Sequence, residues 1–109
     1  MDSYGELRCL EFLTGDRIWE DLSAVKPDRW ANIHFIRQSD LIWMFNEQGE
    51  LLITELSTQG LKEISRAKLI EPTRKQLARG VTWSHPAFAN KHVFIRNDER
   101  LVCADLSAK

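Results

Sequence analysis

The sequence predicts an all-β fold of antiparallel strands, and three observations support this expectation. Apolar and polar residues alternate with a period of two in short runs, which is typical of strands that bury one face. The runs are separated by short segments rich in Gly, Asn, Asp and Ser, which suit tight hairpins. One strand pattern also recurs along the chain. The expected strands cover residues 7–12, 17–21, 32–36, 41–45, 51–56, 62–67, 82–88, 92–96 and 101–106.

The strands fall into three groups, and tight turns join the neighbouring strands within each group. The first group consists of "LRCLEF" and "RIWED", which flank the turn "TGD". The strands of the second group are joined by "RQSD", "NEQGE" and "STQG", and those of the third by "ANK" and "NDER". Because each link is short, we expect neighbouring strands within a group to pair antiparallel.

Two longer connections, "SAVKPDRWA" and "KLIEPTRKQLARG", separate the groups. The second connection is basic, and it either forms a solvated loop or contains a helical turn or two after Pro72. It lacks the interleaved aromatic residues that a nucleic-acid surface needs, so no nucleic-acid partner is expected. In the first connection, Trp30 is the best candidate for an exposed contact residue.

Composition places the chain among globular proteins. Its 109 residues are 43% hydrophobic and 28% charged, which suits one modest domain. With 15 basic and 16 acidic residues, the net charge of -1 gives no general attraction to nucleic acid or acidic lipid. The sequence has neither a secretory signal nor an apolar run of membrane-spanning length, and it leaves the compartment open.

A strand pattern occurs three times. The segments "GELRCLEF", "GELLITEL" and "ERLVCADL" align so that Leu7, Leu51 and Leu101 are equivalent, at offsets of 44 and 50 residues. The runs before and after each copy also correspond. The repeating unit is therefore four antiparallel strands followed by a longer connection, and its length is typical of a propeller blade.

This unit predicts an incomplete β-propeller of about two and a half blades. Residues 1–22 supply a half blade, residues 31–67 one complete blade and residues 80–107 a three-stranded final blade. Since a blade buries both faces against its neighbours, we expect apolar faces to remain open at the two ends. A WD-type propeller is disfavoured, because the Gly-His and Trp-Asp signatures are missing.

The run "CLEFLTGDRIW" resembles the repeat of quinoprotein-like (pyrroloquinoline-quinone-like, PQQ-like) β-propellers, which follows Ala-x-Asp-x-x-Thr-Gly-x-x-x-Trp. Cys9 and Glu11 take the small and acidic positions, Thr14 and Gly15 form the turn, and Trp19 ends the motif. In this family the tryptophan docks between blades, so the resemblance implies that Trp19, Gly15 and Thr14 are structural docking residues. The segment from residue 83 to 106 resembles a final blade, which implies the C-terminal part of a longer propeller.

The resemblance also implies what a quinone enzyme would require. Such an enzyme has an axial site assembled from most blades, with a carboxylate-bound calcium ion and, in the alcohol dehydrogenases, an adjacent cysteine pair. This sequence has no such pair, and about two blades cannot enclose an axial site. We therefore expect no catalytic residues and no cofactor in this chain; PQQ and calcium are expected only for a complete enzyme.

Histidines and cysteines are the remaining candidates for a site. His34 and His85 take equivalent positions in the first strand of successive blades, where they are either structural or axial ligand candidates. Cys9 and Cys103 share one repeat position in different blades, so we expect them to pack in the core without forming a disulfide. Ser84 and His85 are adjacent, and neighbouring strand residues point to opposite faces, so they should not act together in catalysis.

These observations favour a non-catalytic repeat module, either a protein-interaction module or a scaffold. Its expected partners are proteins, namely the remaining blades of a parent propeller or further copies of the chain as a homo-oligomer, and no membrane partner is expected. The alternative is the C-terminal fragment of a PQQ-dependent oxidoreductase.

Overall fold

The computed structural model describes residues 1–76 and 78–108, and within these ranges every regular element is a β-strand. The expected all-β fold with antiparallel sheets is therefore confirmed. No helix capable of crossing a membrane occurs in the described part of the chain. The molecule is flat, with extents of 44 × 38 × 19 Å.

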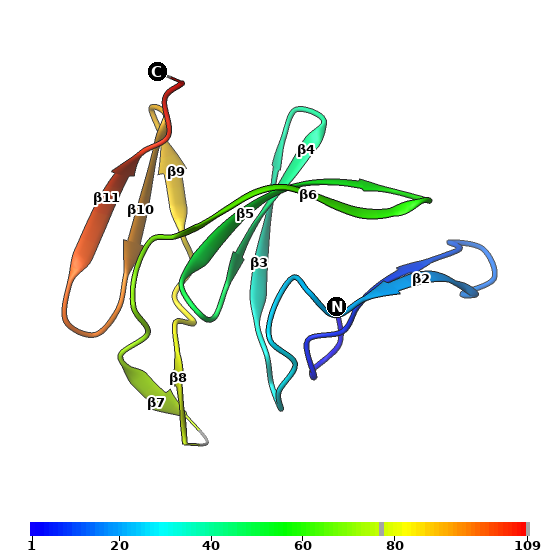
Figure 1. The fold of residues 1–109 in the computed structure, drawn as a ribbon, viewed down its shortest axis with the longest axis horizontal. Helices are drawn as coiled ribbons and strands as arrows, with labels where there is room; N and C mark the ends of the chain where they lie inside the picture. The colour runs from blue at the N-terminus through cyan, green and yellow to red at the C-terminus, as the bar shows by residue number, and fades with distance from the viewer. Residues whose placement is uncertain (77, 109) are drawn as a thin grey trace.

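The strands form four separate antiparallel sheets (Figure 1). The N-terminal hairpin pairs β1 (Leu7–Leu10) with β2 (Arg17–Asp21). The central sheet has the order β3 (Ile33–Gln38), β4 (Leu41–Asn46), β5 (Glu50–Ser57) and β6 (Gly60–Lys68). The connecting hairpin pairs β7 (Arg74–Gln76) with β8 (Arg79–Val81), and the C-terminal sheet has the order β9 (Ala87–Ala89), β10 (His92–Arg96) and β11 (Leu101–Asp105).

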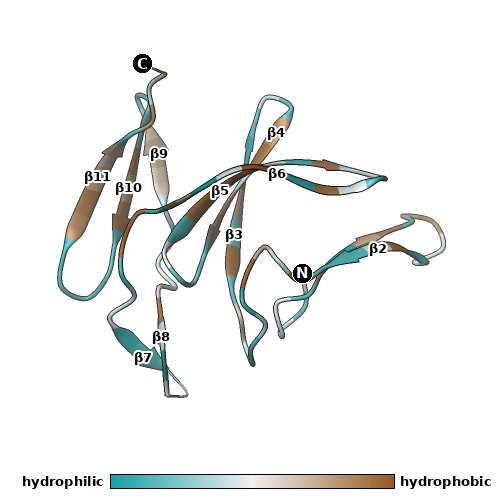
Figure 2. Ribbon diagram, viewed as in Figure 1, coloured by the Kyte–Doolittle hydropathy of each residue, from teal (hydrophilic) through white to brown (hydrophobic). Residues whose placement is uncertain are grey.

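The central sheet is covered on both faces. Because side chains alternate along a strand, Met44 and Leu52 point to one face and Phe45 and Leu51 to the other. The first face packs with the N-terminal hairpin in a cluster with Leu7, Ala24 and Ile33. The second face packs with the C-terminal sheet in a cluster with Ile70, Val93 and Ile95. Figure 2 shows much of β4 and β5 as hydrophobic, in contrast to the hydrophilic β7.

Three turns have related hydrogen-bond patterns, which the repeat alignment missed. Asp2 and Asn46 accept from the second and fourth residues after them, and Asn97 accepts from the second and third. In each turn, a side-chain oxygen accepts two backbone N–H bonds from the same turn, ahead of one copy of the repeated strand. The acceptors are Oδ1 of Asp2 (from Tyr4 and Glu6), Asn46 (from Gln48 and Glu50) and Asn97 (from Glu99 and Arg100), at 2.8 to 3.1 Å.

Two of these turns also contact the preceding long connection in the same way. Nδ2 of Asn46 donates to the Ala24 carbonyl at 3.1 Å, and Nδ2 of Asn97 donates to the Glu71 carbonyl at 2.8 Å. The repeat is therefore present in the turns as well as in the strand sequence.

The basic connection after Pro72 does not contain the helical turn considered from sequence. Residues 74–76 and 79–81 pair as β7 and β8 instead, while residue 77 lies outside the described residues. Ala78 has a φ of 66°, in the left-handed region, which is incompatible with a continuing right-handed helix. This segment therefore returns on itself as a hairpin.

Two expected strands differ from the observed ones. The strand expected at residues 82–88 is reduced to β9, because Pro86 lacks an N–H and restricts the residue before it. The strand expected at residues 7–12 ends at Leu10, after a register shift next to Cys9. Phe12 consequently lies in the hairpin turn with 94% of its surface exposed.

Candidate functional site

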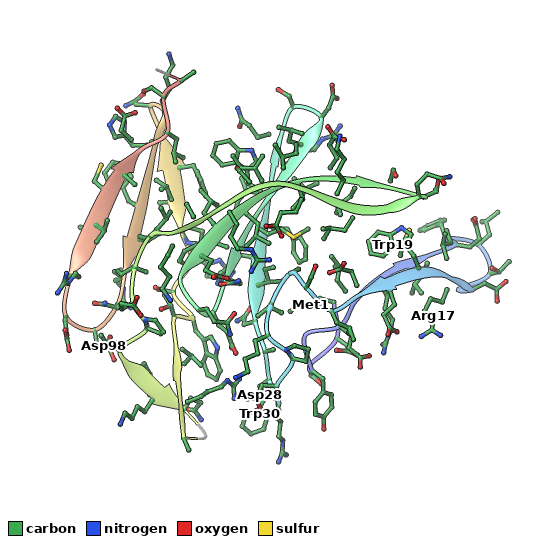
Figure 3. The ribbon with its side chains drawn as sticks, viewed as in Figure 1. Met1, Arg17, Trp19, Asp28, Trp30 and Asp98 are labelled. Atoms are coloured by element: carbon green, nitrogen blue, oxygen red, sulfur yellow. The ribbon has the colours of Figure 1, made fainter. Side chains whose placement is uncertain are left out.

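Trp19 lies between the N-terminal hairpin and the central sheet (Figure 3). Its ring packs against the first core cluster together with Ile42, Leu56 and Leu61. Its Nε1 donates a hydrogen bond to the Ser57 carbonyl at 2.7 Å. The indole therefore joins β2 to the end of β5 through both apolar and polar contacts.

The turn that precedes Trp19 is held by local hydrogen bonds. Oγ1 of Thr14 donates to Oδ2 of Asp16 at 2.9 Å and accepts from the Asp16 backbone at 3.2 Å. Gly15 has a φ of 76°, which favours glycine because a side chain there would be strained. Thr14 and Gly15 thus shape the turn, whereas Trp19 makes the contact with the central sheet.

Glu47 is the centre of a buried polar cluster that the sequence analysis did not predict. None of its surface is exposed. Its carboxylate accepts hydrogen bonds from Nε of Arg79 at 3.0 Å, from Nε1 of Trp83 at 2.8 Å and from the Asn32 backbone at 3.3 Å. The backbone carbonyl of Glu47 accepts from the Thr82 N–H at 2.7 Å.

Arg79 extends this cluster to the first long connection. Its Nη2 donates to the Arg29 carbonyl at 2.8 Å, and its Nη1 lies 3.6 Å from Oδ1 of Asp28. A buried carboxylate needs such a partner, because an unpaired charge in the interior is costly. Glu47 and Arg79 therefore hold the two long connections against the turn between β4 and β5.

The structure brings His34 and His85 together. Their ring centroids are 4.0 Å apart, with the planes tilted by 44°. Burial and the neighbouring His85 lower the pKa of His34, while a hydrogen bond with the Trp83 backbone acts in the opposite direction. Nε2 of His34 is buried without a hydrogen-bond partner among the described residues. His92 is separate and has Nδ1 2.7 Å from the Asn90 carbonyl.

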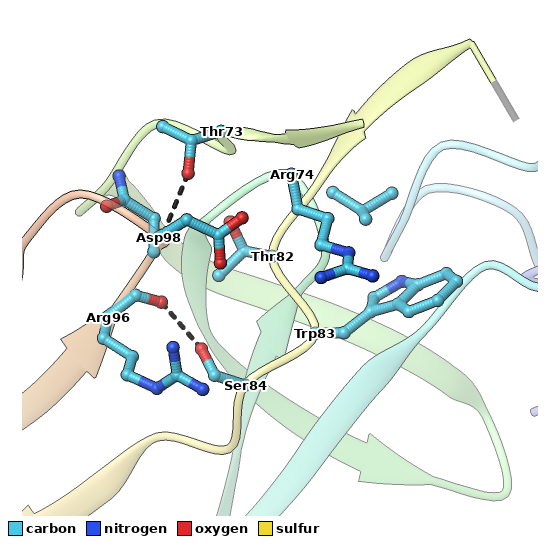
Figure 4. A pocket seen from close by; sticks show the side chains of 9 residues that line it. Thr73, Arg74, Thr82, Trp83, Ser84, Arg96 and Asp98 are labelled. Carbon is cyan, nitrogen blue, oxygen red and sulfur yellow. Dashed lines mark hydrogen bonds between the residues drawn. The ribbon is translucent and has the colours of Figure 1, made fainter. Parts of the chain in front are cut away.

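A pocket of ≈ 310 Å³ lies beside this region, between the connecting hairpin and the turn after β10 (Figure 4). Arg74, Arg96 and Asp98 supply charged groups to its wall, and Thr82 and Trp83 line it from the connection before β9. Ser84 also lines it and donates its hydroxyl to the Arg96 carbonyl at 2.7 Å.

Ser84 and His85 make different contacts, although neither residue lies in a strand. The Ser84 hydroxyl is bonded to a carbonyl group, and the His85 ring lies against His34. A hydrolytic nucleophile needs its base within hydrogen-bond reach, so this geometry does not support serine catalysis by the pair.

The other aromatic candidates lie at contacts between sheets or at the surface. Trp43 meets Phe88 edge to face at 5.7 Å between ring centroids, and so connects the central and C-terminal sheets. Trp30 is 47% exposed, and the Arg29 guanidinium lies 4.6 Å from its ring centroid. Trp30 is therefore available for contact at the surface.

The two cysteines are not disulfide-bonded, but the expectation of core packing is wrong for Cys103. Cys9 is half-buried, whereas Cys103 is exposed. The reason is that Cys103 lies on β11 opposite the exposed Phe94, on a face of the C-terminal sheet that no other sheet covers within residues 1–76 and 78–108.

No family model, curated protein or solved structure matches the chain.

Proposed function

We propose that the chain is a non-catalytic, propeller-type repeat module that binds protein surface, either further repeats of the same kind or a second copy of itself. The observation that carries this proposal is the turn that recurs at Asp2, Asn46 and Asn97, where each side-chain oxygen accepts from the backbone N–H two residues later. A repeat unit cannot bury its apolar faces alone, so each unit depends on a neighbour.

The two-sided burial of the central sheet supports the same proposal. Each face of this sheet packs against a neighbouring sheet, as stacked blades do. The outer sheets lack such cover on their far sides in the described structure, and apolar residues near them are exposed. Leu101, on β11, has 72% of its surface exposed, and Phe12 and Leu13, in the turn between β1 and β2, have 94% and 87% exposed. Exposed apolar groups of this kind favour association with another protein.

Unpaired strand edges offer a second means of association. β1 pairs only with β2, and β11 pairs only with β10, so each has a free edge in the described structure. Free edges can pair with a strand from another chain. The module therefore presents both apolar side chains and backbone groups to a partner.

Sedimentation of the purified chain over a range of concentrations tests the proposal. We expect reversible self-association, because a second copy provides the same edges and apolar groups as a further repeat. Replacing Phe12 and Leu13 by serine should weaken it, whereas Gln59→Ser, at the exposed turn between β5 and β6, should not. A monodisperse monomer with a cooperative thermal transition at every concentration would contradict the proposal.

A further inference from the structure

The pair of His34 and His85 has a feature that packing alone does not explain. Two of the three histidines in the chain meet in ring contact although 51 positions separate them, one on β3 and the other in the segment before β9. Nε2 of His34 is buried and has no hydrogen-bond partner among the described residues. A buried polar atom without a partner is unfavourable unless something binds it.

The hydrogen bonding of His34 defines which nitrogen is free. Nε2 is the ring nitrogen that is buried without a partner among the described residues. A neutral imidazole that donates from Nδ1 carries its lone pair on Nε2. Metal-binding histidines are commonly oriented in this way, with the second nitrogen bonded to a backbone carbonyl.

Side-chain contacts hold the segment that carries Trp83, Ser84 and His85 in place. The Trp83 side chain donates to Glu47 at 2.8 Å, and Glu47 is fully buried and paired with Arg79. His34 lies on β3, in the central sheet. His85 is exposed, so solvent reaches the pair at His85, while Nε2 of His34 is itself buried.

We propose that His34 and His85 bind one divalent transition-metal ion of the zinc or copper class, with Nε2 of His34 as the buried ligand. Imidazole suits these ions, whereas calcium and magnesium prefer oxygen ligands. Residues 1–76 and 78–108 contain no cluster of three or more His, Cys, Asp or Glu residues suited to a metal. Water or an external ligand therefore completes the coordination, and the site is an open one. This inference does not depend on the proposed function.

Bound metal should connect the central sheet to the segment before β9. A ligand that binds only the folded state stabilises it by mass action, so the metal should raise the melting temperature of the chain. The competing explanation is a simple stack of two rings, which would require no metal. The two explanations predict different effects of His85→Phe, which keeps a ring at this position but removes the nitrogen atoms that bind metal.

Calorimetric titration of the full chain with Zn²⁺ tests the proposal, with every protein carrying Cys103→Ser so that the exposed thiol does not bind the ion. We expect one ion per chain, and a loss of affinity of at least about tenfold in His34→Gln and in His85→Gln. His92→Gln is the matched control, since His92 lies outside the pair, and its affinity should be unchanged.

His85→Phe separates ligation from stacking. It keeps a flat ring against His34, so the apo protein should retain its melting temperature while Zn²⁺ binding is lost. Imidazole ¹⁵N shifts provide a second measurement, and Zn²⁺ should displace the signal of His34 Nε2. The proposal is overturned if the parent protein does not bind Zn²⁺, if His85→Phe binds as well as the parent, or if His92→Gln weakens binding as much as His85→Gln does.

Discussion

Nε of Arg79 lies 3.0 Å from Oε1 of Glu47, and this contact joins the turn between β4 and β5 to the connecting hairpin. The Glu47 side chain has no exposed surface, while the Arg79 side chain is 17% exposed. The contact spans 32 positions in the sequence. Both side chains make further hydrogen bonds to other segments, so the pair is part of a network.

Arg79→Met should lower the free energy of unfolding by about 3 to 5 kcal/mol, because it leaves the Glu47 charge buried without its partner. Urea denaturation followed by circular dichroism measures this change. The exposed pair of Lys62 and Glu55, at 3.1 Å, gives the control. Lys62→Met should cost less than about 1 kcal/mol, as surface pairs usually do.

A double variant examines the same pair more closely. Combining Arg79→Met with Glu47→Gln removes both charges, and it should be less destabilised than the sum of the two single variants. Strict additivity would show that the two side chains do not interact energetically, contrary to the observed geometry.

Gly49→Ala should be strongly destabilising, and Gly15→Ala much less so. Both glycines have positive φ values, 80° and 76°, so alanine is strained at both positions. A Cβ at Gly49 would also overlap the carbonyl group of Ile70, whereas a Cβ at Gly15 would meet no atom within 4 Å. Comparing the two melting temperatures therefore isolates the steric contribution. Equal losses would indicate that Ile70 does not approach Gly49 in solution.

Asn46→Ala should destabilise the chain more than Asn97→Ala. Asn46 is buried and donates to both the Ala24 carbonyl and the Glu50 carboxylate, while Asn97 is half-buried and donates to one carbonyl. Leaving such groups without partners costs about 1 to 3 kcal/mol each. Hydrogen exchange of the turn amides measures the local effect, and exchange at Gln48 and Glu50 should accelerate in Asn46→Ala. Unchanged protection of both amides would contradict the pattern of hydrogen bonds.

Trp19→Ala should release the N-terminal hairpin from the central sheet without disturbing the C-terminal sheet. It removes apolar packing and the hydrogen bond to Ser57, with an expected cost of about 3 to 5 kcal/mol. Trp19→Phe retains a ring but not the N–H donor, and should cost less. Residue-resolved hydrogen exchange should show faster exchange in β1 and β2 only. Trp30→Ala, at a half-exposed position, is the control and should change little.

The sequence predicted the central sheet well, since its strands alternate regularly and tight turns join them. It predicted the region from residue 72 to 88 poorly. There, Ala78 adopts a left-handed conformation and Pro86 interrupts pairing, so neither residue follows the pattern of its neighbours. Contacts outside regular strands determine the conformation of this region, and the alternation of apolar and polar residues along the sequence does not reveal such contacts.

The candidate sites also differ in how far the sequence could predict them. His34 and His85 were identified because repeat equivalence relates distant positions, and the structure brings their rings into contact. Glu47 and Arg79 have no equivalents with the same pairing elsewhere in the sequence, so only the three-dimensional structure reveals them. The turn residues Asp2, Asn46 and Asn97 were detectable, since each is an Asx residue shortly before an aligned strand.

The packing of the central sheet allows two molecules to exchange hairpins, because each face of this sheet needs a neighbouring sheet to cover its apolar side chains. When the N-terminal hairpin separates, the face containing Ile33, Met44 and Leu52 loses its cover. A hairpin from another molecule has the same Leu7 and Trp19 and fits that face equally well. The connection from residue 22 to 32 can then act as a hinge, and two chains can exchange hairpins without forming any new kind of contact.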